Sequence, residues 1–247
     1  MDPAYYVAAG SLKARSFQLE VLSNNLANAD TVGYKSERSF YSLFNKANST
    51  GRNLPLTKYV NDGTVLAQRA IDFTQGASKA TGKGLDLAIE GNGFLMIQTP
   101  QGPRATRDGR LKIGEGGQLQ SLDGSPVLGK NGQPLSINPG GEQVTFSPDG
   151  TLQQGSNVLG QLDLKAYVTP YALMRLGSNR YDPTGLAETE VKATVAQGYL
   201  EQSAVDVPTA MIDMIRLNRL FEMSMKIAST LSNDLDASTI NNVANQR

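Results

Sequence analysis

The 247-residue chain contains no cysteine, no histidine and no tryptophan. Without the first two residue types it can form no disulfide, no thiolate nucleophile and no Ser-His-Asp triad, and nearly every kind of zinc site is excluded. An excess of charge is also missing, because lysine plus arginine and aspartate plus glutamate each total 23. A neutral chain has no global basic field, so we expect no nucleic-acid partner. Carboxylate chemistry and a lysine or serine nucleophile remain possible.

Long hydrophobic runs are absent as well. No stretch approaches the ~18 apolar residues of a membrane span, so we expect no membrane insertion. The first twelve residues, MDPAYYVAAGSL, are apolar, but no positive charge precedes them, and Lys13 and Arg15 prevent the apolar stretch from continuing. A secretory signal has a positive start and then an uninterrupted apolar stretch. We therefore expect that any export proceeds without an ordinary cleaved signal peptide.

Both ends of the chain carry helical patterns. Near the N-terminus, apolar residues recur in steps of three and four, with Arg15 as the polar exception, and the stretch 28–33 ends the helix. After Pro208 the same spacing returns, with Ser224 as the polar exception. We call each such line of residues along a helix its seam, and the C-terminal helix has further apolar residues beyond its seam. A helix with so wide an apolar surface requires several neighbours. The C-terminal seam consists of Ala210, Met214, Leu217, Phe221, Ser224, Ala228, Leu231 and Leu235.

The middle of the chain lacks helical periodicity and is rich in turn signals. Gly91-Asn92-Gly93 joins two apolar runs and predicts a β-hairpin, and further turns are predicted at 108–109, 116–117, 123–124, 131–132 and 149–150. The predicted fold class is α+β, with an all-β central domain inserted between N- and C-terminal amphipathic helices that form a coiled-coil-like assembly domain. The predicted parts are an N-terminal assembly helix (1–35), a connector (36–79), a β-rich outer domain (80–185), a return connector (186–209) and a C-terminal assembly helix (210–247). The two connectors should run side by side.

Three possible chemical sites are weak. The glycine-rich TGKGLDLAIEGNG lacks the spacing of a phosphate-binding loop, and neither Asp108-Gly109-Arg110 nor the stretch after Glu115 has the ligand pattern of an EF-hand. Glu90, Asp108 and Glu115 could form a glycosidase pair, but nothing in the sequence sets their separation. We expect no enzymatic activity, no catalytic or metal-binding residue and no cofactor.

The terminal helices have two possible roles. They could form an intramolecular hairpin that covers the β-domain, or they could assemble with other chains. The position of the seams at the chain ends and the amides beside them favour assembly. In SNNLANADTVGYK (23–35), the three amides are expected on one strip beside the apolar face, where they can bond to backbones or other amides. The expected assembly interface consists of Leu12, Leu19, Leu22, Asn24, Asn25, Leu26, Asn28, Met214, Leu217, Phe221, Ala228, Leu231 and Leu235.

Three segments, in this order, carry a resemblance to a known family. SNNLANADTVGYK resembles the N-terminal signature of bacterial flagellar axial proteins, GLDLAIEGNGFLMIQTPQGPRATRDGRLKIGEGGQLQSLDGSPVLGKNG resembles the β-domain of hook and rod proteins, and VAQGYLEQSAVDVPTAMIDMIRLNRLFEMSMKIAS is similar to their C-terminal helix motif. One departure is Ser203-Ala204-Val205-Asp206, where the family usually has Ser-Asn-Val-Asn. The chain is most similar to the flagellar basal-body rod proteins, first the proximal and next the distal rod member. The proximal member comes first because the distal one usually has a longer stretch before the Gly-Tyr-Leu-Glu motif, whereas here the stretch from 176–181 to 198–201 is short.

The resemblance implies a structural subunit of the flagellar rod that transmits torque from motor to hook. It implies helical assembly with itself and other rod proteins, with the terminal helices lining the inner tube and the β-domain facing outward. It also implies passage through the flagellar export apparatus to the periplasm-spanning rod. The alternative is a periplasmic module that binds or cleaves peptidoglycan, which a groove with paired carboxylates would support.

Overall fold

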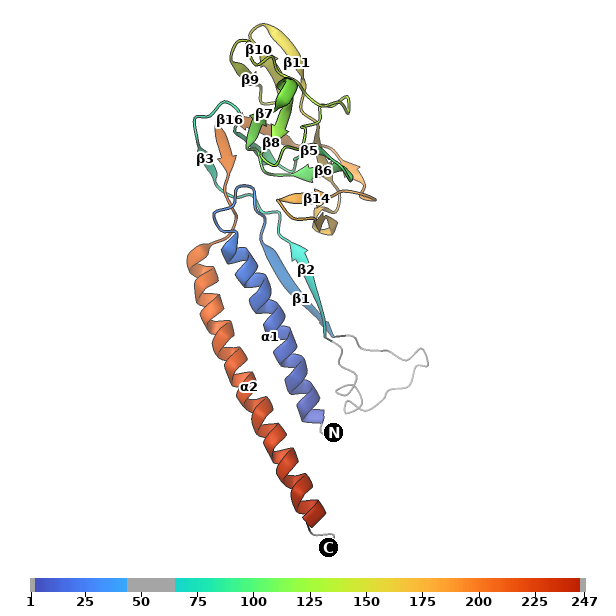
Figure 1. Cartoon of the computed structure of the whole chain (residues 1–247), viewed down its shortest axis with the longest axis vertical. Coiled ribbons are helices and arrows are strands. Elements are labelled where there is room, and N and C mark those ends of the chain that lie inside the picture. Colours follow the sequence, from blue (N-terminus) through green and yellow to red (C-terminus); the bar gives the residue numbers. More distant parts are fainter. Residues whose placement is uncertain (1–2, 44–64, 245–247) are drawn as a thin grey trace. The chain divides into compact units, whose positions relative to one another are not determined.

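The computed structural model describes the backbone of residues 3–43 and 65–244 and the side chains of 9–40 and 69–230. The chain divides into two compact units. Unit 1 comprises Met1–Leu26, Glu37–Ala70 and Asp206–Arg247, and unit 2 comprises Ala27–Ser36 and Ile71–Val205. Two helices at the ends of the chain and a mostly β region between them confirm the predicted α+β class (Figure 1).

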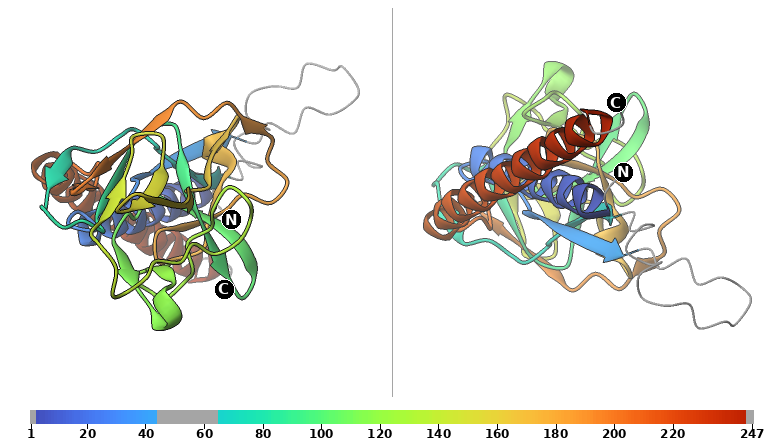
Figure 2. Two further views of the ribbon diagram at one scale, coloured as in Figure 1. Left: turned by 90° about the horizontal axis from the view of Figure 1, so that it is seen from above. Right: turned by 90° about the horizontal axis from the view of Figure 1, so that it is seen from below.

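Unit 1 contains helices α1 (Pro3–Ala27) and α2 (Val207–Ala244) and a two-stranded sheet of β1 (Glu37–Leu43) and β2 (Val65–Ile71). The helices run side by side in opposite directions (Figures 1 and 2). Their 25 and 38 residues correspond to lengths of about 37 and 57 Å at ~1.5 Å per residue. Neither helix, as far as the structure describes it, combines the length and apolar character that crossing a membrane needs.

Unit 2 is built from short antiparallel strands. Its largest sheet has the order β13-β14-β6-β5-β12-β15, and smaller sheets are formed by β11-β10-β9, β16-β4, β17-β3 and β7-β8. The strands are β3 (Ser78–Ala80), β4 (Leu87–Gly91), β5 (Phe94–Thr99), β6 (Gly102–Thr106), β7 (Leu111–Ile113), β8 (Leu119–Ser121), β9 (Val144–Phe146), β10 (Thr151–Gln154), β11 (Asn157–Gln161), β12 (Leu164–Tyr167), β13 (Met174–Arg175), β14 (Arg180–Asp182), β15 (Glu188–Thr189), β16 (Ala193–Gln197) and β17 (Tyr199–Glu201), and the 3-10 turns are η2 (Glu115–Gly117) and η3 (Pro170–Ala172).

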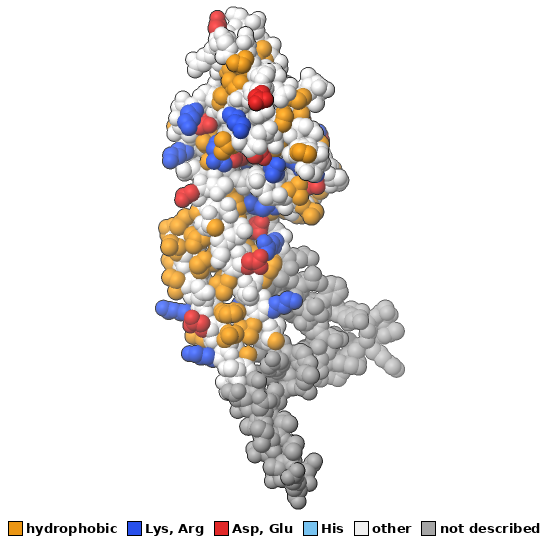
Figure 3. Space-filling model, in the orientation of Figure 1, with side chains coloured by type: hydrophobic (Ala, Val, Ile, Leu, Met, Phe, Trp, Pro, Cys, Tyr) orange, Lys and Arg blue, Asp and Glu red, His pale blue; other side chains and the backbone are white. Residues whose placement is uncertain are grey.

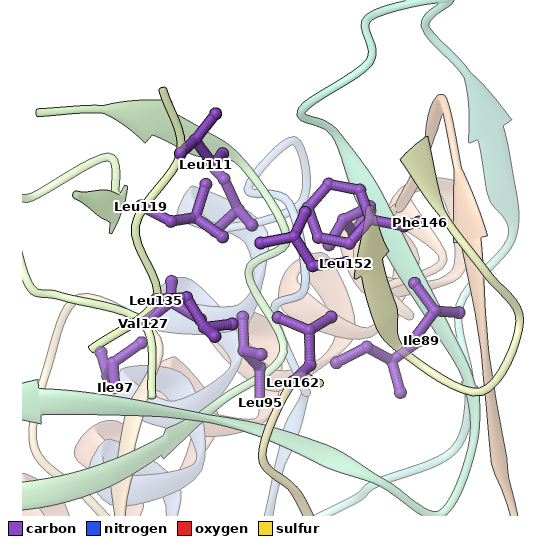
Figure 4. Close-up of a cluster of buried hydrophobic side chains, with 13 residues drawn as sticks. Ile89, Leu95, Ile97, Leu111, Leu119, Val127, Leu135, Phe146, Leu152 and Leu162 are labelled. Atoms are coloured by element: carbon purple, nitrogen blue, oxygen red, sulfur yellow. The ribbon is translucent and has the colours of Figure 1, made fainter. Parts of the chain in front are cut away.

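Strand β5 separates two hydrophobic clusters. Successive side chains of a strand point to opposite faces, so Leu95 and Ile97 enter one cluster while Phe94 and Met96 enter the other. The first cluster gathers leucines, valines and isoleucines from several sheets (Figure 4). The second is aromatic, and Phe94 packs edge-on against Tyr181 with the ring centroids 6.0 Å apart. A strand buried on both faces explains why FLMIQ is almost continuously apolar.

The predicted hairpin at 91–93 is wrong. Strand β4 pairs with β16, whereas β5 pairs with β6 and β12. The Asn92 side chain accepts a bond from the Lys192 N–H at 2.7 Å and donates to the Glu190 carbonyl at 3.2 Å, so it ties this corner to a distant part of the chain. Other predicted turns are confirmed: the one at 149–150 joins the paired strands β9 and β10, and the one at 116–117 joins β7 and β8.

The two predicted connectors meet in unit 2, where β3 pairs with β17. The part of the first connector around β1 and β2 lies in unit 1 instead, and its residues 44–64 fall outside the described residues. Helix α1 ends at Ala27, and the stretch 28–35, expected to belong to the N-terminal assembly helix, lies in unit 2. The reason is that Tyr34 and Lys35 are buried among the strands.

Candidate functional site

The C-terminal seam is the inner face of α2 in unit 1. Ala210 and Ser224 are buried, and the other described seam residues, together with Leu220, are half-buried. Every other described side chain from 211 to 230 is exposed. Ser224, the polar exception, donates its hydroxyl hydrogen to the Leu220 carbonyl at 2.8 Å and so needs no outside partner. The half-buried seam residues are Met214, Leu217, Phe221 and Ala228, while the side chains of Leu231 and Leu235 lie outside the described residues.

Helix α2 also carries an exposed apolar surface, which we call the outer stripe. Its residues are Met211, Ile212, Ile215, Met223, Met225 and Ile227, each between 53% and 67% exposed. Hydrophobic side chains accordingly gather over α2 in the space-filling view (Figure 3). These six large apolar side chains are thus exposed on one helix.

Helix α1 shows a similar division. Its exposed side chains succeed one another at positions 9, 13, 16, 20, 23, 24 and 27, which lie on one polar strip. The remaining described side chains are buried or half-buried, among them the predicted interface residues Leu12, Leu19, Leu22 and Leu26. The two helices therefore turn their seams inward in unit 1 and present the polar strip of α1 and the outer stripe of α2 outward.

The three amides do not share one strip, so that prediction is wrong. Asn24 is exposed on the polar strip, Asn25 is buried and Asn28 lies beyond the end of α1. Adjacent helical residues are separated by ~100° around the axis, so Asn24 and Asn25 cannot face the same way. Asn28 serves the turn after the helix, where its carbonyl accepts a bond from the Thr31 N–H at 3.1 Å.

The side-chain amide of Asn25 forms two hydrogen bonds with the backbone of Glu37, as a neighbouring β-strand would. Its Nδ2 donates to the Glu37 carbonyl and its Oδ1 accepts from the Glu37 N–H, both at 2.8 Å. Arg69 of β2 adds a second link, because its guanidinium lies 2.5 Å from the Glu20 carboxylate and 5.1 Å from the centre of the Phe17 ring. These contacts hold the β1–β2 sheet to α1 within unit 1.

Replacing Asn25 with alanine is expected to destabilise unit 1 by about 2–4 kcal/mol, because both backbone groups of Glu37 lose their amide partner in a buried place. Hydrogen exchange of the β1 amides, measured by mass spectrometry, should become markedly faster. Ser23→Ala is the control, since it removes an exposed polar side chain from the same turn of α1 and should leave exchange unchanged. Equal exchange in the two variants would show that the Asn25 bonds contribute nothing.

A buried cluster of charges, which we call the anchor, lies in unit 2. Its members Lys35, Arg107 and Glu201 are 0%, 3% and 1% exposed. The Lys35 Nζ lies 2.5 Å from one Glu201 oxygen, and the Arg107 Nη1 lies 3.5 Å from the other. Lys35 also donates to the Thr74 carbonyl at 2.9 Å, Arg107 donates to two carbonyls of β4, and the Gly76 N–H donates to Glu201 at 2.9 Å. Each charged group is thus hydrogen-bonded in its buried place, although the Arg107 Nε has no partner among the described residues.

The anchor fixes the path of residues 32–36. The Gly33 N–H donates to the Glu201 carbonyl at 2.8 Å, and the Arg175 guanidinium stacks over the Tyr34 ring at 4.3 Å while it also donates to the carbonyl of the next residue. Tyr34 is 1% exposed. The end of the N-terminal signature is therefore a buried element of unit 2.

Burial changes the acid–base properties of this region. Desolvation lowers the pKa of Lys35 below its usual value, while the neighbouring Glu201 carboxylate acts in the opposite direction. Burial raises the pKa of Tyr181 to about 12, and its hydroxyl has no hydrogen-bond partner among the described residues. The Tyr181 phenol is therefore neutral at ordinary pH, and Lys35 is paired with Glu201, so both groups contribute to the structure of unit 2.

The carboxylates of Glu90, Asp108 and Glu115, which were considered for glycoside cleavage, do not form the pair that this reaction needs. Asp108 is engaged by Arg110, whose Nε and Nη2 lie 2.9 and 2.5 Å from its two oxygens. Glu90 is exposed on β4, and Glu115 is exposed in η2. In the part of the chain that the structure describes, no three Asp, Glu, His or Cys side chains gather to hold a metal ion.

Two hollows of unit 2 have room for part of a sugar chain. One, of about 550 Å³, contains Asp123, whose carboxylate lies 3.2 Å from Arg180. The other, of about 300 Å³, contains Glu142. Each offers a single carboxylate, whereas general acid–base cleavage of a glycoside needs two. The alternative of a peptidoglycan-cleaving module therefore gains no support from these hollows.

Sequence comparisons identify the family. Residues 6–35 match the model described as "Flagella basal body rod protein", residues 88–154 match "Flagellar hook protein FlgE/F/G D1 domain", and residues 196–242 match "Flagellar basal body rod FlgEFG protein C-terminal". Among curated relatives, the flagellar basal-body rod protein FlgF of Caulobacter vibrioides is 33% identical over 92% of both chains. The chain belongs to the flagellar basal-body rod protein family.

Relatives named FlgF and relatives named FlgG are similar to this chain to about the same degree. FlgF of Rhizobium meliloti is 31% identical over 90% of both chains, and FlgG of Borreliella burgdorferi is 31% identical over 95% of this chain and 97% of its own. In this rod-family chain, the first matched segment ends at Lys35 and the last contains Glu201, so the two segments meet in the anchor. Sequence reasoning missed the anchor, although a lysine directly after Gly-Tyr and a glutamate directly after Gly-Tyr-Leu were visible.

Proposed function

We propose that this chain is a structural rod subunit that polymerises, with copies of itself and with other rod proteins, through α1 and α2. The observation that carries the proposal is the outer stripe, because six large apolar side chains more than half exposed on one helix are costly in water. In a helical polymer they would pack against neighbouring helices, which gives the coiled-coil-like assembly domain expected from the sequence. The predicted interface residues on the seams would then pack inside each subunit and hold α1 and α2 in the arrangement that presents the outer stripe.

The proposed location rests on the family. We propose that the protein passes through the flagellar export apparatus without a cleaved signal and takes its place in the periplasm-spanning rod. There the helices would form the inner tube, the β-strands of unit 2 would face outward, and the polymer would transmit torque from motor to hook. The short path from the end of β14 to β17 supports the proximal over the distal position.

The double variant Ile212→Asp, Ile215→Asp tests this proposal. Both side chains are exposed in the outer stripe, so the monomer should keep the parent's circular dichroism and melting temperature. In a polymer the two charges would be buried against a neighbour at a cost of several kcal/mol, and assembly should fail. The measurements are sedimentation of the concentrated protein and recovery of motility in cells that lack the native gene.

The matched control is Asn218→Asp, which adds a charge at an exposed polar position of the same helix. It should sediment and restore motility as the parent does. Full motility of the double variant would reject the outer stripe as an assembly surface.

A further inference from the structure

Unit 2 is assembled from two pieces of the chain. The larger piece, Ile71–Val205, is continuous and contains strands β3 to β17, and we call it the body. The smaller piece, Ala27–Ser36, includes residues 32–36, which we call the signature peptide. On both sides of the smaller piece, at Leu26 and at Glu37, the chain lies in unit 1. Within unit 2, therefore, only noncovalent contacts join the signature peptide to the body.

The body binds the backbone of the signature peptide through hydrogen bonds along its length. These bonds join the Val32 carbonyl to Asn179 Nδ2 (2.7 Å), the Gly33 N–H to the Glu201 carbonyl (2.8 Å), the Lys35 carbonyl to the Arg175 guanidinium, and the Ser36 carbonyl to the Asp72 N–H (2.8 Å). In peptide-binding sites, main-chain bonds of this kind supply affinity, and pockets for the side chains supply specificity. The body contains both features.

Two positions of the signature peptide are selected by shape. Gly33 has a positive φ, and a Cβ there would lie 2.5 Å from the Arg107 carbonyl oxygen, so the body fits glycine at this position. The Tyr34 ring is 1% exposed, and the Arg175 guanidinium lies 4.3 Å from its centre. Such a cation–π contact requires an aromatic ring. The body therefore recognises glycine followed by an aromatic residue.

The next position is selected by charge. The Lys35 Nζ lies 2.5 Å from one Glu201 oxygen and donates to the Thr74 carbonyl at 2.9 Å. The other Glu201 oxygen lies 3.5 Å from Arg107, which belongs to the body. A body without its peptide would thus keep one ion pair and present a buried carboxylate oxygen to an incoming ammonium group. The recognised sequence is glycine, an aromatic residue and lysine.

We propose that the body of unit 2 is a binding site for a Gly-Tyr-Lys peptide, and that a second copy of the chain supplies this peptide when the chain's own segment does not fit. In the intact chain the own segment occupies the site, because its covalent connection gives it a high effective concentration. The same segment of a second copy offers identical contacts, and exchange of an identical element joins two copies at little cost. The site lies within unit 2 and is independent of the polymerisation proposed for α1 and α2.

A synthetic peptide tests the site directly. The receiver is a full chain with Gly33→Ala and Tyr34→Ala, whose own segment no longer fits while its body is unchanged. A fluorescent peptide of residues 27–37 should bind saturably and slow hydrogen exchange of the β4 amides, because a ligand of the folded state stabilises it. The same peptide with Gly33→Ala should bind at least tenfold more weakly.

A second receiver with Gly33→Ala alone keeps more of its own contacts and covers the case in which the double variant does not fold. Absence of peptide binding to both receivers, or equal binding of the two peptides, would overturn the proposal.

Exchange between copies is tested with two full chains. The donor carries Glu201→Ala, so its segment is intact while its own site lacks the carboxylate. Both chains also carry Ile212→Asp and Ile215→Asp, which removes association through the outer stripe. The donor should form a one-to-one complex with an isotopically labelled receiver and slow exchange of the receiver's β4 amides.

The matched control is a donor that also carries Tyr34→Ala, which should neither bind the receiver nor slow its exchange. If the peptide binds while the donor has no more effect than this control, exchange between copies is overturned. Because the outer stripe is disabled in both chains, either result leaves the proposed rod function untouched.

Discussion

Glu201→Ala is expected to destabilise unit 2 by about 3–5 kcal/mol, because it leaves two buried cations without their carboxylate. Such a loss is a large part of the ~5–15 kcal/mol that holds a typical domain folded. The Gly76 N–H would lose its acceptor as well. Hydrogen exchange of the β4 and β5 amides, measured against urea concentration, reports this unit specifically.

Two further variants make the prediction sharper. Lys35→Met should cost less than Glu201→Ala, since Glu201 would still face Arg107 and no cation would be left alone. Glu188→Ala is the control for an ion pair of similar length: its carboxylate lies 2.5 Å from Lys165 but is 56% exposed, so its loss should cost less than about 1 kcal/mol. Equal losses for Glu201→Ala and Glu188→Ala would contradict a structural role for the anchor.

The parts of the fold that sequence reasoning predicted are those with a local cause. The inner face of α2 results from residues three and four apart, and every described seam residue is indeed among its less exposed ones. The turn at 149–150 was predictable because glycine accepts the positive φ of 82° that it has there. The family resemblance was likewise carried by continuous segments.

The missed features depend on residues far apart in the chain. Lys35 and Glu201 are 166 positions apart, and no periodicity connects them. Asn25 was predicted to belong to the assembly interface because its actual partner, the backbone of Glu37, lies beyond the helix. At Gly91-Asn92-Gly93 the turn itself was correct, whereas the pairing was decided by β16, about a hundred residues later. Whether the seam and the amides also contact other subunits stays a prediction.

Gly33→Ala is expected to be a strongly damaging single-methyl change beside the anchor. Gly33 has a φ of +67°, and a Cβ there would lie 2.5 Å from the Arg107 carbonyl oxygen, a backbone atom. The left-handed conformation costs a non-glycine residue about 1–2 kcal/mol, and relief of the clash requires backbone movement worth about 1–3 kcal/mol more. The same movement would pull the Gly33 N–H from the Glu201 carbonyl.

The variant Gly82→Ala separates the cost of the left-handed conformation from the cost of the clash. Its φ of +69° is almost the same, but a Cβ there would meet nothing within 4 Å, so Gly82→Ala carries only the conformational cost. Exchange of the β4 amides should therefore accelerate far more in Gly33→Ala than in Gly82→Ala, and only the former should impair motility when it replaces the native gene. Because residues 32–36 belong to unit 2, a displaced Gly33 would loosen the packing of this segment within that unit. Equal effects of the two alanines would mean that this segment can shift freely, and that the anchor does not determine its path.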